Sequence, residues 1–169
     1  IRHRVNDIET LRDTPNEMGV EIDIRTSQDN LILSHDPFTE GLPLNEWIKK
    51  YNHRFLILNT KEDGLEDKIL EVLNNYKIED FFFLDQPFPS VRKTIEKGCS
   101  KIALRFSEYE SMSSLEMMSG QCEWVWIDSF KTFSHDLNTL FKIRGLGYKL
   151  CFVSPELQGR DSYEERQKI

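Results

Sequence analysis

The stretch "GVEIDIRTSQDNLILSHDP", residues 19–37, decides the fold, because its first half alternates apolar and polar side chains. This alternation predicts a β-strand over residues 19–25. Glu21 and Asp23 are two residues apart, so both carboxylates lie on the same face of that strand. The stretch therefore places two acids where a strand of a packed sheet would normally carry apolar side chains.

The second half of the stretch predicts a return arm. The residues "SQDN" at 27–30 are typical of a turn, and residues 31–34 are apolar enough to pair back as the second strand of a hairpin. His35 and Asp36 follow this arm directly. We therefore expect a histidine close to the acid pair.

The rest of the chain alternates short apolar strands with amphipathic helices. Besides the hairpin arm, seven strands are expected, at residues 2–5, 19–25, 55–60, 81–85, 101–106, 124–128 and 149–153. Helices are expected at residues 44–52, 64–77, 88–97, 110–119 and 134–144. Repeated strand–helix units of this kind predict parallel strands with right-handed crossovers.

Two α/β architectures fit this pattern, an open doubly wound sheet and a TIM-type (β/α)8 barrel. The first predicted strand lacks the glycine-rich loop of the doubly wound class. Polar residues instead follow nearly every strand, and in a barrel they would meet at one face. They are His3, Arg4, Glu21, Asp23, Asn59, Lys61, Asp85, Arg105, Ser107, Asp128, Ser154 and Glu156. The barrel is therefore the expected fold.

The expected barrel shows seven strands, and no eighth strand is visible after residue 153. Such barrels typically have about 250 residues. Three explanations stay open: the ordered part stops early, the chain is truncated at its C-terminal side, or the barrel is open between its first and seventh strands. Without a repeat or linker in the sequence, we expect a single domain over residues 1–169.

The composition excludes several classes of protein. Hydrophobic residues make up 38% of the chain and charged residues 30%, as in ordinary globular proteins. The net charge of −7 argues against a nucleic-acid partner, and no apolar run reaches the roughly 20 residues that span a bilayer. The three cysteines match no zinc or disulfide pattern. These features predict a cytoplasmic protein without stable membrane insertion, and they leave its oligomeric state open.

The acid pair itself points to a cation. Two neighbouring buried carboxylates repel each other unless a proton or a cation neutralises them. Oxygen ligands of this kind suit Mg²⁺ or Ca²⁺. The alternative is that Glu21 and Asp23 form the solvated face of a plain hairpin.

The order of these motifs resembles the glycerophosphodiester phosphodiesterase family. The resemblance is carried by "HR" at 3–4, "GVEIDIR" at 19–25, "LILSHDP" at 31–37 and "ILNTK" at 57–61. The wider group comprises the phosphodiesterase-type (β/α)8 barrels, which also include phosphatidylinositol phospholipase C and sphingomyelinase D. The motifs cover about the first 61 residues, and the strand pattern extends the match to about residue 155.

The resemblance implies a metal-dependent phosphoric diester hydrolase with a role in lipid metabolism. It implies that His3 and His35 are the acid–base pair and that a hydroxyl of the substrate can attack, giving a cyclic phosphate. It also implies that Glu21 and Asp23 hold the divalent cation, while Arg4 and Lys61 bind the phosphate oxygens. The expected substrate is a small polar phosphodiester linked to glycerol, a polyol or a sugar.

The sequence departs from the family pattern at two places. Asn59 stands where the family has a third metal-binding acid, so it is expected to ligate through an uncharged amide oxygen. Ile8 stands where the family has an asparagine, before Glu9 and Thr10. The first departure supports an alternative function, a weakly active or inactive barrel that binds a phosphorylated sugar or a lipid head group.

Further residues are candidates for substrate contacts. Arg105 could clamp a phosphate or carboxylate, or form a salt bridge with Asp85 or Asp128. Trp126, together with Asp128, could stack on a ring of the substrate, or Trp126 could pack in the core. Asp85 is a further candidate for a substrate contact.

The sequence also suggests roles or positions for three further polar residues. Glu156 could contact substrate hydroxyls. His53 and His135 are expected to face solvent from helical surfaces.

Overall fold

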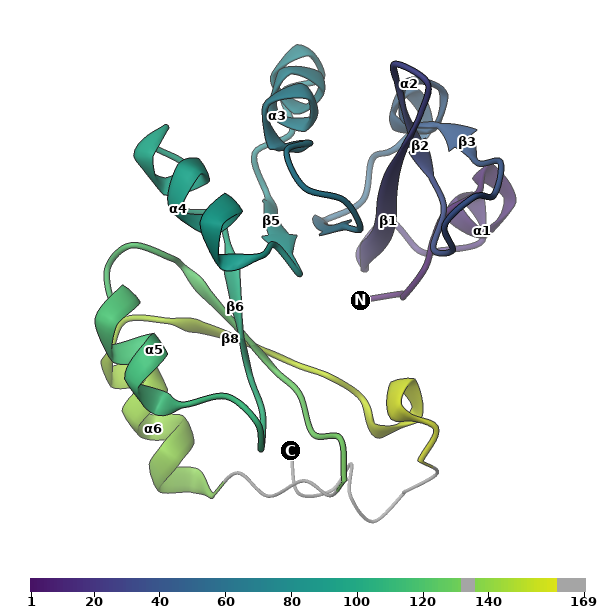
Figure 1. Ribbon diagram of the computed structural model, residues 1–169. Coiled ribbons are helices and arrows are strands. Elements are labelled where there is room, and N and C mark those ends of the chain that lie inside the picture. The colour runs from purple at the N-terminus through teal and green to yellow at the C-terminus, as the bar shows by residue number, and fades with distance from the viewer. Residues whose placement is uncertain (132–135, 161–169) are drawn as a thin grey trace. The chain divides into compact units, whose positions relative to one another are not determined.

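The computed structural model of the protein describes residues 1–131 and 136–160. The chain forms two compact units, residues 1–97 and 98–169, each with its own sheet (Figure 1). The histidine at position 135 lies outside the described residues. None of the helices in the described ranges is long and apolar enough to cross a membrane.

The first unit contains a five-stranded mixed sheet in the order β3-β2-β1-β4-β5. Its strands are β1 (Gly19–Ser27), β2 (Asn30–Leu33), β3 (Leu42–Pro43), β4 (Phe55–Thr60) and β5 (Phe81–Leu84). Strands β1, β4 and β5 are parallel, whereas β2 runs antiparallel to β1. The predicted hairpin between residues 19–25 and 31–34 is therefore confirmed.

The predicted first strand, residues 2–5, is reduced to a single parallel bridge between Arg2 and Val20. The backbone N–H of Arg2 donates to the Gly19 carbonyl at 2.8 Å, and that of Val5 donates to the Glu21 carbonyl at 2.8 Å. Arg4 has a φ of 55°, which interrupts the extended backbone between these two bonds. The segment thus runs along β1 in the expected direction, but it is not a regular strand.

Apolar residues on both sides of the β1–β4 pair form the core of this unit. Val20, Ile22 and Ile24 alternate with the two acids along β1 and are fully buried. The helical elements are α1 (Ile8–Arg12), α2 (Leu44–Trp47), η1 (Ile48–Lys50), α3 (Glu66–Asn75) and α4 (Phe88–Glu96). They agree with the expected helices at residues 44–52, 64–77 and 88–97, and their apolar faces are buried.

The second unit contains three parallel strands in the order β6-β7-β8. These are β6 (Ala103–Phe106), β7 (Trp124–Ile127) and β8 (Lys149–Phe152), with helices α5 (Met112–Met118) and α6 (Leu137–Gly145) and the short helix η2 (Pro155–Gln158). Ile102, Val125 and Ile143 are fully buried in this unit.

The fold is mixed α/β, and the prediction of parallel strands alternating with helices is confirmed within each unit. The described residues do not show a closed TIM-type (β/α)8 barrel, because their strands are divided between two open sheets. After β8 the described residues, which end at residue 160, form the short helix η2 and no further strand. Closure of the barrel and a single domain over residues 1–169 stay predictions.

Candidate active site

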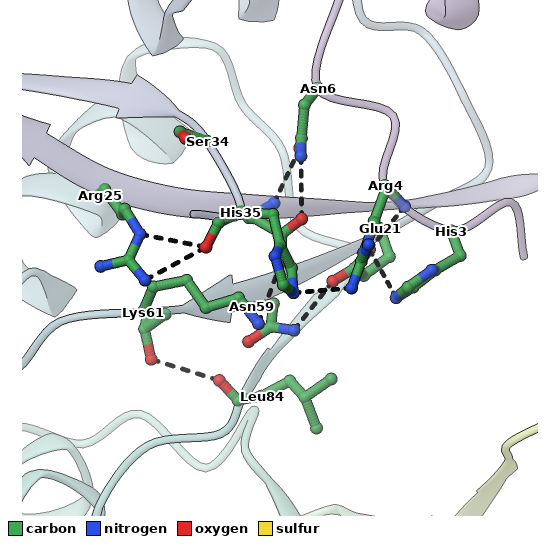
Figure 2. A network of polar contacts seen from close by, with 12 residues as sticks. His3, Arg4, Asn6, Glu21, Arg25, Ser34, His35, Asn59, Lys61 and Leu84 are labelled. Carbon is green, nitrogen blue, oxygen red and sulfur yellow. Dashed lines mark hydrogen bonds and ion pairs between the residues drawn. The ribbon is translucent and has the colours of Figure 1, made fainter. Parts of the chain in front are cut away.

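Two segments that are distant in sequence share one edge of β1. The N-terminal segment pairs with the first half of β1 through the Val5–Glu21 bond, and β2 pairs with the second half. The backbone N–H of Ser34 donates to the Asp23 carbonyl at 3.0 Å, where β2 leaves the sheet. The two segments therefore end beside the acid pair, and each delivers a histidine to it (Figure 2).

Glu21 and Asp23 lie side by side under this junction and are 1% and 0% exposed. In the parallel β1–β4 register, Asp23 is opposite Asn59. The Asn59 amide donates to Glu21 Oε1 at 3.0 Å, and Lys61 Nζ lies 3.1 Å from Asp23 Oδ1 (Figure 2). Glu21 and Asp23 therefore do not form the solvated face of a plain hairpin.

The burial of Glu21 changes its protonation. Desolvation, and secondly the charge of Asp23, raise the pKa of Glu21 from 4.5 to about 7. Hydrogen bonds from the Arg4 backbone and from Asn59 act in the opposite direction, but they are weaker than the desolvation. Without a bound cation, Glu21 is thus about half protonated at neutral pH.

This raised pKa predicts that the Glu21 carboxyl stabilises the metal-free protein more at pH 5 than at pH 8. The folded state binds the Glu21 proton more tightly than the unfolded state, so stability falls as the pH rises from 4.5 through 7. The contribution of this carboxyl to the free energy of unfolding should fall by about 2 kcal/mol over that range. Glu21→Gln should remove this part of the pH dependence, as measured by urea unfolding in excess chelator.

The structure can accept this substitution without losing hydrogen bonds. The new side-chain oxygen can accept from the Arg4 backbone N–H, and the new amide can donate to Asn59 Oδ1 after the Asn59 amide rotates. Glu46→Gln, at an exposed position of α2, is the control and should keep the wild-type pH dependence. A Glu21→Gln variant with an unchanged pH dependence would contradict the prediction.

His35 is held between Arg4 and Asp36. Arg4 Nη2 lies 2.7 Å from His35 Nε2, and Asp36 Oδ1 lies 2.7 Å from His35 Nδ1. Because a guanidinium can only donate, Nε2 accepts from Arg4 and the ring proton is on Nδ1, where Asp36 accepts it. The hydrogen bond from His35 also lowers the pKa of Asp36.

His3 lies on the other side of Arg4, and its Nε2 is 3.6 Å from Glu21 Oε2 (Figure 2). Burial, and secondly the charge of Arg4, lower the pKa of His3 below 6.5. His3 is therefore neutral at physiological pH. The Arg4 backbone N–H also donates to Glu21 Oε2 at 2.7 Å, which explains why Arg4 takes its unusual backbone conformation.

Asn6 was not among the candidates from the sequence, although it completes the surroundings of Asp23. Its Nδ2 donates to Asp23 Oδ2 at 2.8 Å, and its Oδ1 accepts from the Asp23 backbone N–H at 2.9 Å. A single asparagine after "HRV" carries no spacing that would mark this role. Only the pairing of the N-terminal segment with β1 places it there.

The donor set at this junction suits a hard divalent cation. Asn59 Oδ1 is buried and accepts no hydrogen bond from the described residues. Together with the Glu21 and Asp23 carboxylates it provides oxygen ligands of the kind that Mg²⁺ and Ca²⁺ prefer. The described part of the chain holds no group of three or more His, Cys, Asp or Glu residues, so the uncharged Asn59 amide would have to complete the set.

Arg105, Trp126, Asp128 and Glu156 belong to the second unit. Arg105 forms an ion pair with Asp128, one of the two alternatives for that arginine, and Gln158 donates to Asp128 Oδ1 at 2.8 Å. Trp126 is only 8% exposed, as expected for core packing. The substrate contacts of these candidates therefore stay predictions.

Asp85 and His53 both belong to the first unit. Asp85 follows β5 with a φ of 61° and is exposed. The prediction for His53 was wrong: it is 8% exposed, and its Nε2 lies 2.9 Å from the Thr14 carbonyl. Residues 51–54 form a loop after η1 that packs against the chain around Thr14, a contact that the local sequence pattern does not contain.

Comparison with known proteins finds a likeness in fold. The chain is similar to the crystal structure of a glycerophosphoryl diester phosphodiesterase from Parabacteroides distasonis, with a TM-score of 0.70 and 16% identity, over 98% of this chain and 72% of that one. It is also similar to a proposed glycerophosphoryl diester phosphodiesterase from Agrobacterium tumefaciens, with a TM-score of 0.62 and 12% identity, over 79% and 72% of the two chains. No family profile and no curated protein sequence matches the chain. The resemblance in the motifs is thus supported by the fold.

Proposed function

We propose that the protein is a metal-dependent phosphoric diester hydrolase that acts on a small polar phosphodiester. The observation that carries the proposal is the meeting of His3 and His35 above the buried Glu21–Asp23 pair. The likeness in fold to glycerophosphoryl diester phosphodiesterases supports the same class of reaction. The proposed substrate carries glycerol, a polyol or a sugar on at least one side.

The two histidines have different surroundings, which suggests different roles. The lowered pKa of His3 keeps it neutral, so His3 is suited to take the proton from the attacking hydroxyl. The Asp36 carboxylate orients the His35 ring through Nδ1, and His35 is assigned the second role, protonation of the leaving alkoxide. Substrate phosphate would draw Arg4 away from His35 Nε2, since a guanidinium binds phosphate oxygens more strongly than a neutral imidazole.

The divalent cation in this proposal would be held by Glu21, Asp23 and Asn59. When bound, it would neutralise the negative charge that develops on the phosphoryl oxygens. Lys61 already pairs with Asp23 at 3.1 Å and would bind a phosphate oxygen at the same junction. Asn6 would keep the Asp23 carboxylate oriented through its two hydrogen bonds.

Removal of divalent cations should abolish hydrolysis. The purified chain, stripped with chelator, would be tested on bis(p-nitrophenyl) phosphate and on glycerol-linked phosphodiesters, with and without Mg²⁺ or Ca²⁺. Activity should return on addition of one of these ions, and ³¹P NMR should show whether a cyclic phosphate forms. Full activity in excess chelator would contradict the assignment of the metal.

The uncharged Asn59 favours a second candidate function, a binding protein for phosphorylated sugars or lipid head groups. An amide ligand contributes no charge, so the cation would be held more weakly than by three acids. This candidate predicts saturable binding of such ligands with no turnover of any phosphodiester in either ion. Hydrolysis with multiple turnovers would exclude it.

A further inference from the structure

Arg25 lies on the same face of β1 as Glu21 and Asp23, two residues beyond Asp23. Its Nε and Nη2 both donate to the backbone carbonyl of His35, at 3.2 and 3.1 Å (Figure 2). The Arg25 side chain is only 16% exposed. A planar guanidinium of low exposure therefore holds the peptide group that follows His35.

The contact between Arg25 and the His35 carbonyl differs from the contacts of the His35 ring. The partners of the ring, Arg4 and Asp36, are both exposed, and the Asp36 side chain is 74% exposed. The whole segment from Asp36 to Glu40 is exposed, and Phe38 within it has a φ of 61°. Two parallel N–H donors on one carbonyl restrict both the position and the tilt of a peptide group. Arg25 is thus a restraint of low exposure at the start of an exposed loop.

Glu62 orients Arg25 from the opposite side. Its Oε1 lies 3.5 Å from Arg25 Nη1, while its Oε2 accepts from the backbone N–H and the hydroxyl of Thr26, at 3.1 and 2.5 Å. The Lys61 backbone N–H donates to the Ile24 carbonyl at 3.0 Å, which brings Glu62 to the end of β1. These contacts connect the end of β4, the end of β1 and the loop that carries His35.

We propose that Arg25 is a positioning residue for His35 and that Glu62 orients Arg25. The effect on turnover rests on the proposed function, because it requires His35 to transfer a proton. A shift of about 1 Å in a catalytic group can cost about 100-fold in rate. Loss of Arg25 should therefore lower turnover although Arg25 is not assigned to the substrate or the metal.

Kinetics of four variants and a matched control test this role. Arg25→Ala should lower kcat about 30- to 100-fold with KM changed less than about 3-fold, and Arg25→Lys, which keeps one donor, should lose less. Glu62→Ala should have a smaller effect, and Arg25→Ala/Glu62→Ala should be no worse than Arg25→Ala alone. Arg92→Ala is the matched control: it removes an arginine–glutamate pair at 3.4 Å on α4 and should leave kcat unchanged. An Arg25→Ala variant with wild-type kcat would overturn the proposal.

NMR of the His35 ring tests the role of Arg25 without requiring enzymatic activity. It can therefore be interpreted even if the proposed function is wrong. Long-range ¹H–¹⁵N NMR of the imidazole should show the Nδ1–H form of His35 in the wild type and a mixture of ring forms in Arg25→Ala. Arg25→Lys provides the same comparison if the alanine variant does not fold. If no phosphodiester is hydrolysed by the wild type, the proposed function fails while this test still decides the role of Arg25. Unchanged His35 signals in both arginine variants would overturn it.

Discussion

His3→Ala and His35→Ala should each lower kcat by about 1,000-fold or more, while substrate binding is largely kept. Each variant removes a group that accepts or donates a proton in the proposed reaction, which is typically worth about 10²- to 10⁴-fold. Binding should persist because Arg4 and Lys61, which are assigned to the phosphate, stay in place. Steady-state kinetics on an activated and a natural-type phosphodiester would measure both quantities.

The leaving group of the substrate distinguishes the roles of the two histidines. A p-nitrophenolate leaving group needs little protonation, so loss of the general acid should cost much less with bis(p-nitrophenyl) phosphate than with a glycerol-linked diester. With His35 as the acid, only His35→Ala should show this difference. The lowered pKa of His3 also predicts that kcat/KM declines at a lower pH than it would with a histidine of ordinary pKa. Unchanged turnover in either alanine variant would remove that histidine from the mechanism.

Asn59→Glu should tighten binding of Mg²⁺ or Ca²⁺ by about 10-fold or more. The substitution adds a third carboxylate beside two that are buried, and the charge of the ligands strongly influences the affinity for divalent cations. In the metal-free protein the same charge has no compensating cation, so the free energy of unfolding should fall by about 2 kcal/mol. Calorimetric titration of the stripped protein and urea unfolding in chelator would measure the two effects.

Asn59→Gln is the matched control for this variant. It has the same length as the glutamate substitution but carries no charge, so any effect of size alone appears in both variants. The metal affinity should rise only in Asn59→Glu. Equal affinities in the wild type and both variants would show that position 59 is not a ligand and would return the metal site to Glu21 and Asp23 alone.

Much of the local structure could be predicted because it depends on neighbouring residues. The short apolar strand predicted at residues 55–60 matches β4 at both ends, and the helix predicted at residues 64–77 contains α3. The turn residues after β1 predicted a hairpin that is present. The spacing of Glu21 and Asp23 also placed both on one strand face, since that periodicity is a property of the strand itself.

The supporting contacts of the site could not be predicted in this way. Arg4 and His35 are 31 residues apart, and Asn59 and Glu21 are 38 apart, so their contacts depend on strand register. The same holds for the hydrogen bonds of Asn6 and for the buried position of His53. Arg25 could have been noticed, because it continues the period-two face of Glu21 and Asp23, but its partner is a backbone carbonyl that no sequence motif marks.

The sequence alone determined the hairpin, β4, α3, the acid pair and the order of the histidine motifs, because each depends on side chains that are close along the chain. Only the tertiary structure decided that the N-terminal segment and β2 share one edge of β1, and so place His3 beside Glu21 and His35 against Arg4. It also decided that Asn59 bonds to Glu21 and Lys61 pairs with Asp23. The physical reason is that backbone pairing between distant segments sets which side chains meet.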